Sequence, residues 1–291
     1  MHQNNDKINN IEIGKTYLHR FAFLGGGNMG GAMINGFINS GIVKPSEIIV
    51  YDIDSSKYDS YIMSGVHTAD NAVSAARGAE YTVIATKPSC VATSMRELSA
   101  DKSIFENTTF ISIAAAVPMS FICESLDSEV PIIRTMPSTP MLIGQGAIAI
   151  CRNSLVKKES FEFVCNLFSA LAEISIMEED GLNSIISVNG SSPAYVYLFV
   201  KAMLDGALEQ GITREQALPL ILKTIEGSVG MIRQSDVEIE ELIRRVASPN
   251  GTTLAALDSF RREDFEGIIK RAMNACTQRA NEISNELIQS N

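Results

Sequence analysis

Strand-like and helix-like patterns alternate along the chain from Phe21 to about Glu178. The apolar run Phe21–Leu24 has the length of a buried strand, and after a glycine-rich turn the apolar positions take helical spacing at Met29, Met33 and Phe37. The further predicted strands are Ile48–Tyr51, Val66–Thr68, Tyr81–Thr86, Thr109–Ile113, Ile132–Thr135, Ala147–Ile150 and Glu173–Ile176. This alternation predicts an α/β domain with a doubly wound, mainly parallel sheet, which binds ligands at the carboxyl ends of its strands.

Beyond Glu178 the strand pattern does not recur, and the chain has helical spacing to its end. We therefore predict a polar N-terminal extension over residues 1–19, an α/β domain over residues 20–179 and an all-α domain over residues 180–291.

The helix that follows Pro193 carries its polar residues in one narrow stripe. Lys201, Asp205 and Glu209 are spaced by four residues, and the remaining faces are apolar. Because one small helical domain cannot cover such a helix, we expect partner helices from a second chain and hence an obligate homodimer, with a higher oligomer of dimers allowed. The alternative is a central helix within a single chain.

The turn between the first strand and the first helix has the sequence GGGNMG and satisfies the pattern Gly-x-Gly-x-x-Gly. Gly25 permits the tight turn, Gly27 lets a pyrophosphate approach the backbone, and Gly30 lets the helix pack closely on the strand. Asn28 and Met29 complete the turn, where free N–H groups at the helix start face the anion.

Asp52 ends the second predicted strand about 20 residues beyond Gly30, where the dinucleotide fingerprint has an acid for the adenosine ribose. Together these features predict a Rossmann domain that binds NAD(P)H. A carboxylate repels a 2′-phosphate and no arginine occurs in Ile53–Ser56, so Asp52 favours NADH over NADPH. The other strand ends expected along the cofactor are Thr86-Lys87-Pro88 and Ala114-Ala115-Ala116.

Composition narrows the possible partners. A net charge of −10 argues against a nucleic-acid or anionic-membrane surface. The 5 cysteines are far apart without a Cys-x-x-Cys motif, so we expect neither a disulfide framework nor a metal site. The N-terminus lacks a signal-peptide pattern and no apolar run is long enough to span a membrane. We expect a cytoplasmic protein that acts on a small molecule.

The segment Ser248–Thr253 has the sequence SPNGTT and precedes an apolar helical stretch. Proline and glycine end the preceding helix, and the hydroxyls then lie beside unpaired N–H groups at a helix start, which is the composition of a small carboxylate site. An ordinary helix-capping loop is the alternative.

Six motifs follow one another along the chain: Phe23-Leu24-Gly25 to Met29, Ala85-Thr86-Lys87-Pro88, Arg134 to Pro140, Gly190-Ser191-Ser192-Pro193-Ala194-Tyr195, Leu204-Asp205-Gly206-Ala207 with Gly211, and Ser248-Pro249 with Gly251-Thr252-Thr253. No single motif is specific, but the order of all six is. Through these motifs the chain resembles the pyrroline-5-carboxylate reductase family from Phe21 to about Glu282.

The resemblance implies that the protein reduces the cyclic imine 1-pyrroline-5-carboxylate to L-proline with hydride from NAD(P)H. It also implies an interleaved helical dimer whose second subunit completes each active site. Thr253 then hydrogen-bonds the ring nitrogen. The implied carboxylate site consists of Ser248 and the backbone of Gly251, Thr252 and Thr253. The residues implied to lie along the cofactor are Met29, Asn71, Lys87, Ala114 and Ala115. For Lys87 and Asn71 the alternatives are an exposed strand-end lysine and a helix-start residue.

Two glycines of the family pattern are replaced here by residues with side chains. The family usually has Ser-Gly-Ser-Gly-Pro-Ala-Tyr, where this chain has Asn189–Tyr195 with Ser192 in place of the second glycine. It usually has Ser-Pro-Gly-Gly-Thr, where this chain has Asn250 in place of the first glycine. Asparagine tolerates the left-handed conformation, so Asn250 is expected to be harmless, whereas Ser192 can narrow the site or change the imine it accepts.

Two other functions compete with this interpretation. A β-hydroxyacid dehydrogenase has a catalytic lysine within about one helical turn of a glycine-rich turn, followed by an asparagine. Lys201 lies too far beyond Gly190 and is followed by Asp205, so that match fails. A reductase-like protein that binds nucleotide but has a regulatory role is the second competitor, because the altered glycines allow it.

Overall fold

The computed structural model describes residues 17–289, so residues 1–16 of the predicted N-terminal extension lie outside the described part of the chain. Internal contacts divide the chain into two compact units. The first unit comprises Met1–Gly190 together with Arg279–Asn291, and the second unit comprises Ser191–Gln278. These units are defined by packing. The predicted boundary near residue 180 divides the chain by function and stays a prediction.

The first unit is built on a single sheet that has eight strands among the described residues. The strands are β1 (His19–Leu24), β2 (Ile48–Tyr51), β3 (His67–Thr68), β4 (Ala79–Ile84), β5 (Thr109–Ser112), β6 (Ile132–Pro137), β7 (Gly146–Arg152) and β8 (Ala172–Ile176). Their order is β3-β2-β1-β4-β5-β6-β7-β8, and each neighbouring pair is parallel except β6 and β7. The predicted fold class, a mainly parallel doubly wound sheet, is confirmed.

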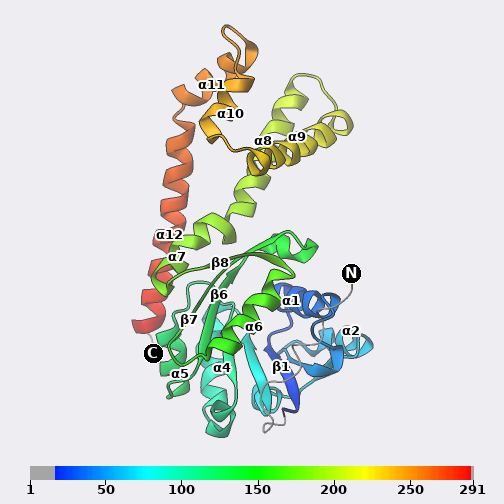
Figure 1. Ribbon diagram of the computed structural model, residues 1–291, viewed down its shortest axis with the longest axis vertical. Helices are drawn as coiled ribbons and strands as arrows, with labels where there is room; N and C mark the ends of the chain where they lie inside the picture. The colour runs from blue at the N-terminus through cyan, green and yellow to red at the C-terminus, as the bar shows by residue number, and fades with distance from the viewer. Residues whose placement is uncertain (1–16, 290–291) are drawn as a thin grey trace. The chain divides into compact units, whose positions relative to one another are not determined.

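Helices cover both faces of this sheet (Figure 1). The helices of the first unit are α1 (Asn28–Asn39), α2 (Tyr58–Met63), α3 (Ala72–Ala76), α4 (Val91–Leu98), α5 (Met119–Leu126), α6 (Lys158–Ser169) and α7 (Leu182–Ile185). Residues of α3, α4 and α5 share one core cluster, and residues of α1, α2 and α6 share the other. In the second cluster Phe21 of β1 stacks on Tyr81 of β4 with ring centroids 5.1 Å apart. The sheet is therefore buried between two apolar layers, and ligands can reach it at the ends of its strands.

Two elements differ from the sequence prediction. The apolar pattern did not reveal α5, because most of its residues are buried and it therefore lacks the polar stripe of a surface helix. The predicted strand Ile132–Thr135 is too short, because β6 continues through Pro137. Its last residues pair with β7, Met136 with Ala149 and Pro137 with Ile148.

The second unit is helical among its described residues. It contains α8 (Ser192–Glu209), α9 (Arg214–Gln234), α10 (Ile239–Val246), α11 (Thr252–Arg262) and most of α12 (Phe265–Gln289). Its own core is small and centres on Leu204, Ala217 and Ile221. No described helix is both long and apolar enough to cross a membrane.

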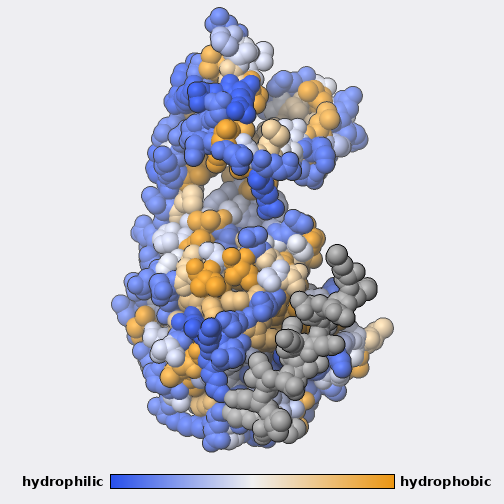
Figure 2. Space-filling model, viewed as in Figure 1, coloured by the Kyte–Doolittle hydropathy of each residue, from blue (hydrophilic) through white to orange (hydrophobic). Residues whose placement is uncertain are grey.

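Helix α8 is poorly covered by its own chain. Leu204 is its one buried residue, whereas Tyr197 and Leu198 are 64% and 66% exposed. Figure 2 shows apolar surface among the helices of this unit. The alternative of a central helix that one chain covers by itself is therefore wrong, and this surface is available for a partner.

Candidate active site

The glycine-rich turn joins β1 to α1 at the centre of the sheet, where the strand order changes direction between β1 and β4. Gly25 has a φ of 110°, and a Cβ there would lie 2.6 Å from the carbonyl oxygen of Ala85. A Cβ on Gly30 would overlap the carbonyl oxygen of Gly25. Both glycines are therefore required by close backbone packing, as predicted from the spacing.

The start of α1 is open to an anion. Gly27 is the N-cap and provides no side-chain cap, the first turn contains no acidic residue, and a Cβ on Gly27 would meet no atom within 4 Å. The first N–H groups of α1 thus remain available for a phosphate. A groove of about 780 Å³ passes this point and brings Gly27, Asn28 and Lys57 together along α1.

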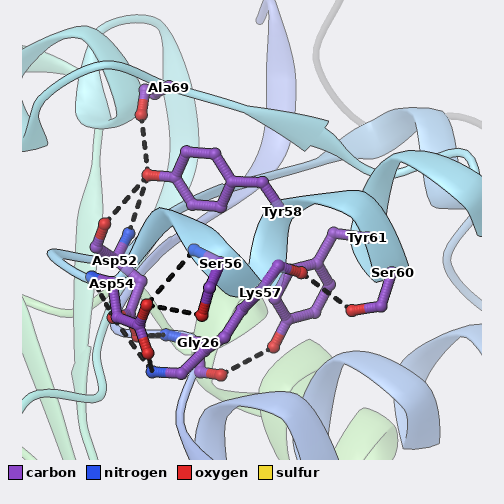
Figure 3. Close-up of polar contacts among 9 residues, drawn as sticks. All are labelled: Gly26, Asp52, Asp54, Ser56, Lys57, Tyr58, Ser60, Tyr61 and Ala69. Atoms are coloured by element: carbon purple, nitrogen blue, oxygen red, sulfur yellow. Dashed lines mark hydrogen bonds and ion pairs between the residues drawn. The ribbon is translucent and has the colours of Figure 1, made fainter.

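Asp52 lies beside the glycine-rich turn and is held there by three donors (Figure 3). Its Oδ2 accepts a hydrogen bond of 2.7 Å from the N–H of Gly26, and its Oδ1 accepts from the N–H of Asp54 at 2.9 Å and from Lys57 Nζ at 3.0 Å. Burial opposes ionisation of Asp52, but the hydrogen bonds from Asp54, Lys57 and Gly26 outweigh it and lower its pKa. The carboxylate is therefore charged at neutral pH.

Two tyrosines of α2 fix the surroundings of Asp52 (Figure 3). The hydroxyl of Tyr61 donates to the carbonyl oxygen of Gly26 at 2.8 Å, a Cβ on Gly26 would strike its ring, and a Cβ on Gly31 would lie 3.0 Å from its hydroxyl oxygen. The hydroxyl of Tyr58 accepts from the N–H of Asp52 at 3.1 Å and lies 3.0 Å from the carbonyl oxygen of Ala69. The contacts of Tyr58 and Tyr61 therefore fix the turn that would hold the cofactor.

Sequence reasoning missed Tyr61 and Lys57. The arginine-free segment Ile53–Ser56 ends one residue before Lys57. For Tyr61 a signal exists in the chain, because Gly26 and Gly31 both lack side chains where α1 begins, and a bulky group can then lie across them.

The strand ends next to the turn carry the other predicted cofactor residues. Thr86 follows β4, and its Oγ1 is buried without a hydrogen-bond partner among the described residues. Lys87 is exposed and precedes Pro88 at the start of a short 3-10 helix. Asn71 is the N-cap of α3, and its Oδ1 accepts from the N–H of Ser74 at 2.8 Å. Its helix-start role is therefore real, and its cofactor role stays a prediction.

Ala114 and Ala115 follow β5 on the same edge of the sheet, and both are small enough to leave room for a ring. Ala114 is 4% exposed, and its N–H donates to Ser112 Oγ at 3.4 Å. With Gly25 to Gly30, Asp52 and Thr86, they form the predicted line of strand ends in the first unit. Parallel strands bind ligands at this edge.

The candidate substrate residues lie in the second unit, at the start of α11. The N–H of Gly251 donates to the carbonyl oxygen of Ser248 at 3.0 Å, which closes a tight turn. Asn250 has a φ of 61°, so it adopts the left-handed conformation that the sequence led us to expect. A Cβ on Gly251 would strike Ser248 Oγ. Gly251 is the N-cap of α11 and provides no side-chain cap, so the first N–H groups of that helix can hold a carboxylate.

Comparisons with known proteins bear on this arrangement. The family model for the NADP oxidoreductase coenzyme F420-dependent domain matches residues 20–116, and the model for pyrroline-5-carboxylate reductase dimerisation matches residues 179–283. The pyrroline-5-carboxylate reductase of Escherichia coli strain K12 is 32% identical over 91% of this chain and 98% of its own length. The chain belongs to the pyrroline-5-carboxylate reductase family.

Other members of the family agree with this assignment. The Pseudomonas aeruginosa pyrroline-5-carboxylate reductase is 33% identical and covers 93% of this chain and 98% of its own length. A crystal structure of the Plasmodium falciparum pyrroline carboxylate reductase with NADP bound superimposes with a TM-score of 0.84 at 27% identity, covering 91% of this chain and 98% of that one.

The residues of the first unit fit a dinucleotide of the kind that this pyrroline-5-carboxylate reductase family uses. The open start of α1 can take the pyrophosphate, and Thr86 Oγ1 is a buried polar atom that still lacks a partner among residues 17–289. The same described residues contain no group of three or more His, Cys, Asp or Glu that could hold a metal ion.

Proposed function

We propose that this protein reduces 1-pyrroline-5-carboxylate to L-proline with NAD(P)H. Family membership supports the reaction class, and the single structural observation that carries the proposal is the uncapped start of α1 behind Gly25 and Gly27. When bound, NAD(P)H supplies a hydride from C4 of its nicotinamide to the imine carbon, while the imine nitrogen takes up a proton and the C=N bond becomes a single bond.

The chain itself binds and orients the reactants. The first N–H groups of α1 hold the pyrophosphate, Asp52 binds the adenosine ribose, and Thr86 Oγ1 supplies a further hydrogen bond. The remaining proposed cofactor contacts come from Asn28, Met29, Asn71, Lys87, Pro88, Ala114 and Ala115. Because a protonated cyclic imine accepts hydride readily, positioning and exclusion of water provide most of the catalysis.

The turn before α11 is the proposed substrate site. The N–H groups of Gly251, Thr252 and Thr253 bind the carboxylate, together with Ser248. Such groups attract an anion without a charged side chain. The hydroxyl of Thr253 hydrogen-bonds the ring nitrogen and so orients the C=N bond. No histidine is required.

The proposed cofactor preference is less one-sided than the sequence alone indicates. Asp52 argues for NADH, because a carboxylate repels a 2′-phosphate. Lys57 lies beside Asp52, compensates its charge and offers an ammonium group to that phosphate. We therefore infer that the protein accepts both NADH and NADPH, with Lys57 as the residue that admits the second.

We also propose that the functional form is a homodimer. The exposed apolar residues of α8 support it, as does the match to a dimerisation domain. In this proposal residues 20–179 bind the dinucleotide, residues 180–291 dimerise and bind substrate, and the second subunit completes each active site. A cytoplasmic location accords with this biosynthetic role.

One assay separates the proposed function from its competitors. Purified protein is mixed with pyrroline-5-carboxylate and either NADH or NADPH, and the loss of reduced nicotinamide is followed with proline formation. Oxidised nicotinamide and proline formed in equal amounts support the reductase. Turnover with hydroxy acids alone would establish a dehydrogenase, and dinucleotide binding without turnover would establish a regulatory protein.

A further inference from the structure

The loop between β5 and α5 contains a strained residue at the proposed cofactor edge. Ala116 has a φ of 61°, in the left-handed region that residues with a Cβ rarely adopt. It is 2% exposed and directly follows Ala114 and Ala115. A strained conformation of this kind persists only where surrounding groups enforce it.

Ser284 is the group that holds this residue. Its Oγ donates to the carbonyl oxygen of Ala116 at 2.7 Å, although the carbonyl oxygen of Ala280 on its own helix lies at 3.1 Å. Ser284 is 5% exposed, so water does not compete for the bond. The two residues are 168 positions apart in sequence, yet both belong to the first unit.

The hydroxyl of Ser284 is itself oriented by a network of hydrogen bonds between polar side chains. Asn183 Nδ2 donates to Ser284 Oγ at 3.0 Å and to Asn281 Oδ1 at 3.0 Å. Asn183 Oδ1 in turn accepts from Nη2 of Arg134 at 2.8 Å, and that arginine is 4% exposed. Because Ser284 accepts from Asn183, its own proton is left for Ala116.

The same hydrogen-bond network also holds the other end of the loop. Arg134 Nη1 lies 3.0 Å from Glu179 Oε1, and that oxygen also accepts a hydrogen bond of 2.7 Å from the N–H of Met119, the first residue of α5. The loop from Ala114 to Met119 is thus fixed at Ala116 by Ser284 and at Met119 by Glu179. Two bonds from one network determine its shape.

We propose that Ser284 is a positioning residue for hydride transfer. Its hydroxyl holds Ala116 in the left-handed turn and thereby fixes the position of Ala114 and Ala115 relative to the bound cofactor. The inference rests on the proposed function. It does not make Ser284 a catalytic residue, because Ser284 acts through the backbone of the loop. A displacement of about 1 Å at such a loop can cost up to about 100-fold in rate.

The test is Ser284→Ala in the full-length protein. We expect kcat for imine reduction to fall about 10-fold, with the imine KM and the dinucleotide Kd changed by less than about twofold, because alignment is lost while binding groups remain. The isotope effect with deuterium at C4 of the reduced nicotinamide should rise, since hydride transfer becomes slower. In the absence of dinucleotide, amide hydrogen exchange in the peptide that contains Ala116 should accelerate.

Ser99→Ala is the matched control. Ser99 Oγ donates to the carbonyl oxygen of Arg96 at 2.8 Å at the end of α4, so the variant removes a serine-to-carbonyl bond within one segment of the first unit but no bond to another segment. If Ser284→Ala does not fold, Asn281→Ala at the exposed end of the network should show the same changes at a smaller size.

An unchanged kcat and isotope effect in a folded Ser284→Ala protein would overturn the proposal, as would unchanged exchange of the loop. Those results leave the proposed function intact when the wild type is active. An inactive wild type would instead overturn the proposed function and, with it, this inference.

Discussion

Lys57 Nζ lies 3.0 Å from Oδ1 of Asp52, so the carboxylate proposed to bind the adenosine ribose has a cation beside it. The side chain of Asp52 is 9% exposed and that of Lys57 is 37% exposed, which leaves part of the ammonium group accessible. The pair therefore presents both charges at the end of β2. A dinucleotide with or without a 2′-phosphate can find a partner there.

The first prediction concerns Lys57→Ala. We expect the KM for NADPH to rise about 10-fold, because the variant loses one charge-assisted hydrogen bond to the 2′-phosphate. The KM for NADH should change little. The measurement is steady-state kinetics with both cofactors at saturating imine. Lys102→Ala is the control, because it removes a lysine paired with Asp127 at 2.7 Å in the same unit. Equal losses for both cofactors would remove Lys57 from the phosphate site.

The second prediction concerns pH and Asp52→Asn. Hydrogen bonds keep the pKa of Asp52 below its ordinary value of 3.8, so its charged form stabilises the folded state. That stabilisation is complete above the unfolded pKa and is lost as pH falls through the folded pKa. The free energy of unfolding of the wild type should exceed that of Asp52→Asn by about 1–2 kcal/mol at pH 7.

Denaturant titrations of both proteins at a series of pH values test the linkage. The difference in unfolding free energy should shrink as pH falls below 3.8. A difference that grows toward acid pH has the wrong sign and would contradict a lowered pKa.

The third prediction concerns the left-handed turn at Asn250. Asn250→Ala should destabilise the protein by about 1 kcal/mol, because alanine lacks the tolerance of asparagine for a positive φ. Asn250→Gly should preserve both the melting temperature and the imine KM. Thermal unfolding and steady-state kinetics measure the two effects. An alanine variant as stable as the wild type would show that this turn is relaxed in solution.

The fourth prediction concerns Thr253. Thr253→Ala should lower kcat/KM for the imine about 10- to 100-fold, because it deletes a hydrogen bond to a group that becomes charged. Dinucleotide affinity, measured by NADH fluorescence, should remain unchanged. Thr253→Ser keeps the hydroxyl and should retain most of the activity. A rate that survives the alanine substitution would exclude Thr253 from the site.

Local patterns were enough to predict most of the sheet. The apolar runs at Phe21–Leu24 and Ile48–Tyr51 are the buried residues of β1 and β2, and the glycines between them take the conformations that their spacing requires. The left-handed turn at Asn250 was also predictable, because few residues other than glycine and asparagine accept that geometry.

Contacts between distant segments were not predictable in this way. Tyr61 meets Gly26 across 35 positions, and Ser284 meets Ala116 across 168. Neither bond has a periodic signature, since each depends on how finished elements pack. Helix α5 escaped notice for a related reason, because burial on most faces removes the polar stripe that marks a helix.

Arg279–Asn291 belong to the first unit although they follow the second unit in sequence, and this has a consequence for folding during translation. The ribosome synthesises the strands of the sheet before these residues, with the whole of Ser191–Gln278 translated in between. Ser284, which holds the loop after β5, is therefore synthesised only after the helical unit. A nascent chain can assemble its sheet early, but the loop after β5 gains its hydrogen bond from Ser284 only after the helical unit has been translated, and a premature stop just ahead of Ser284 would leave the carbonyl oxygen of Ala116 without that bond.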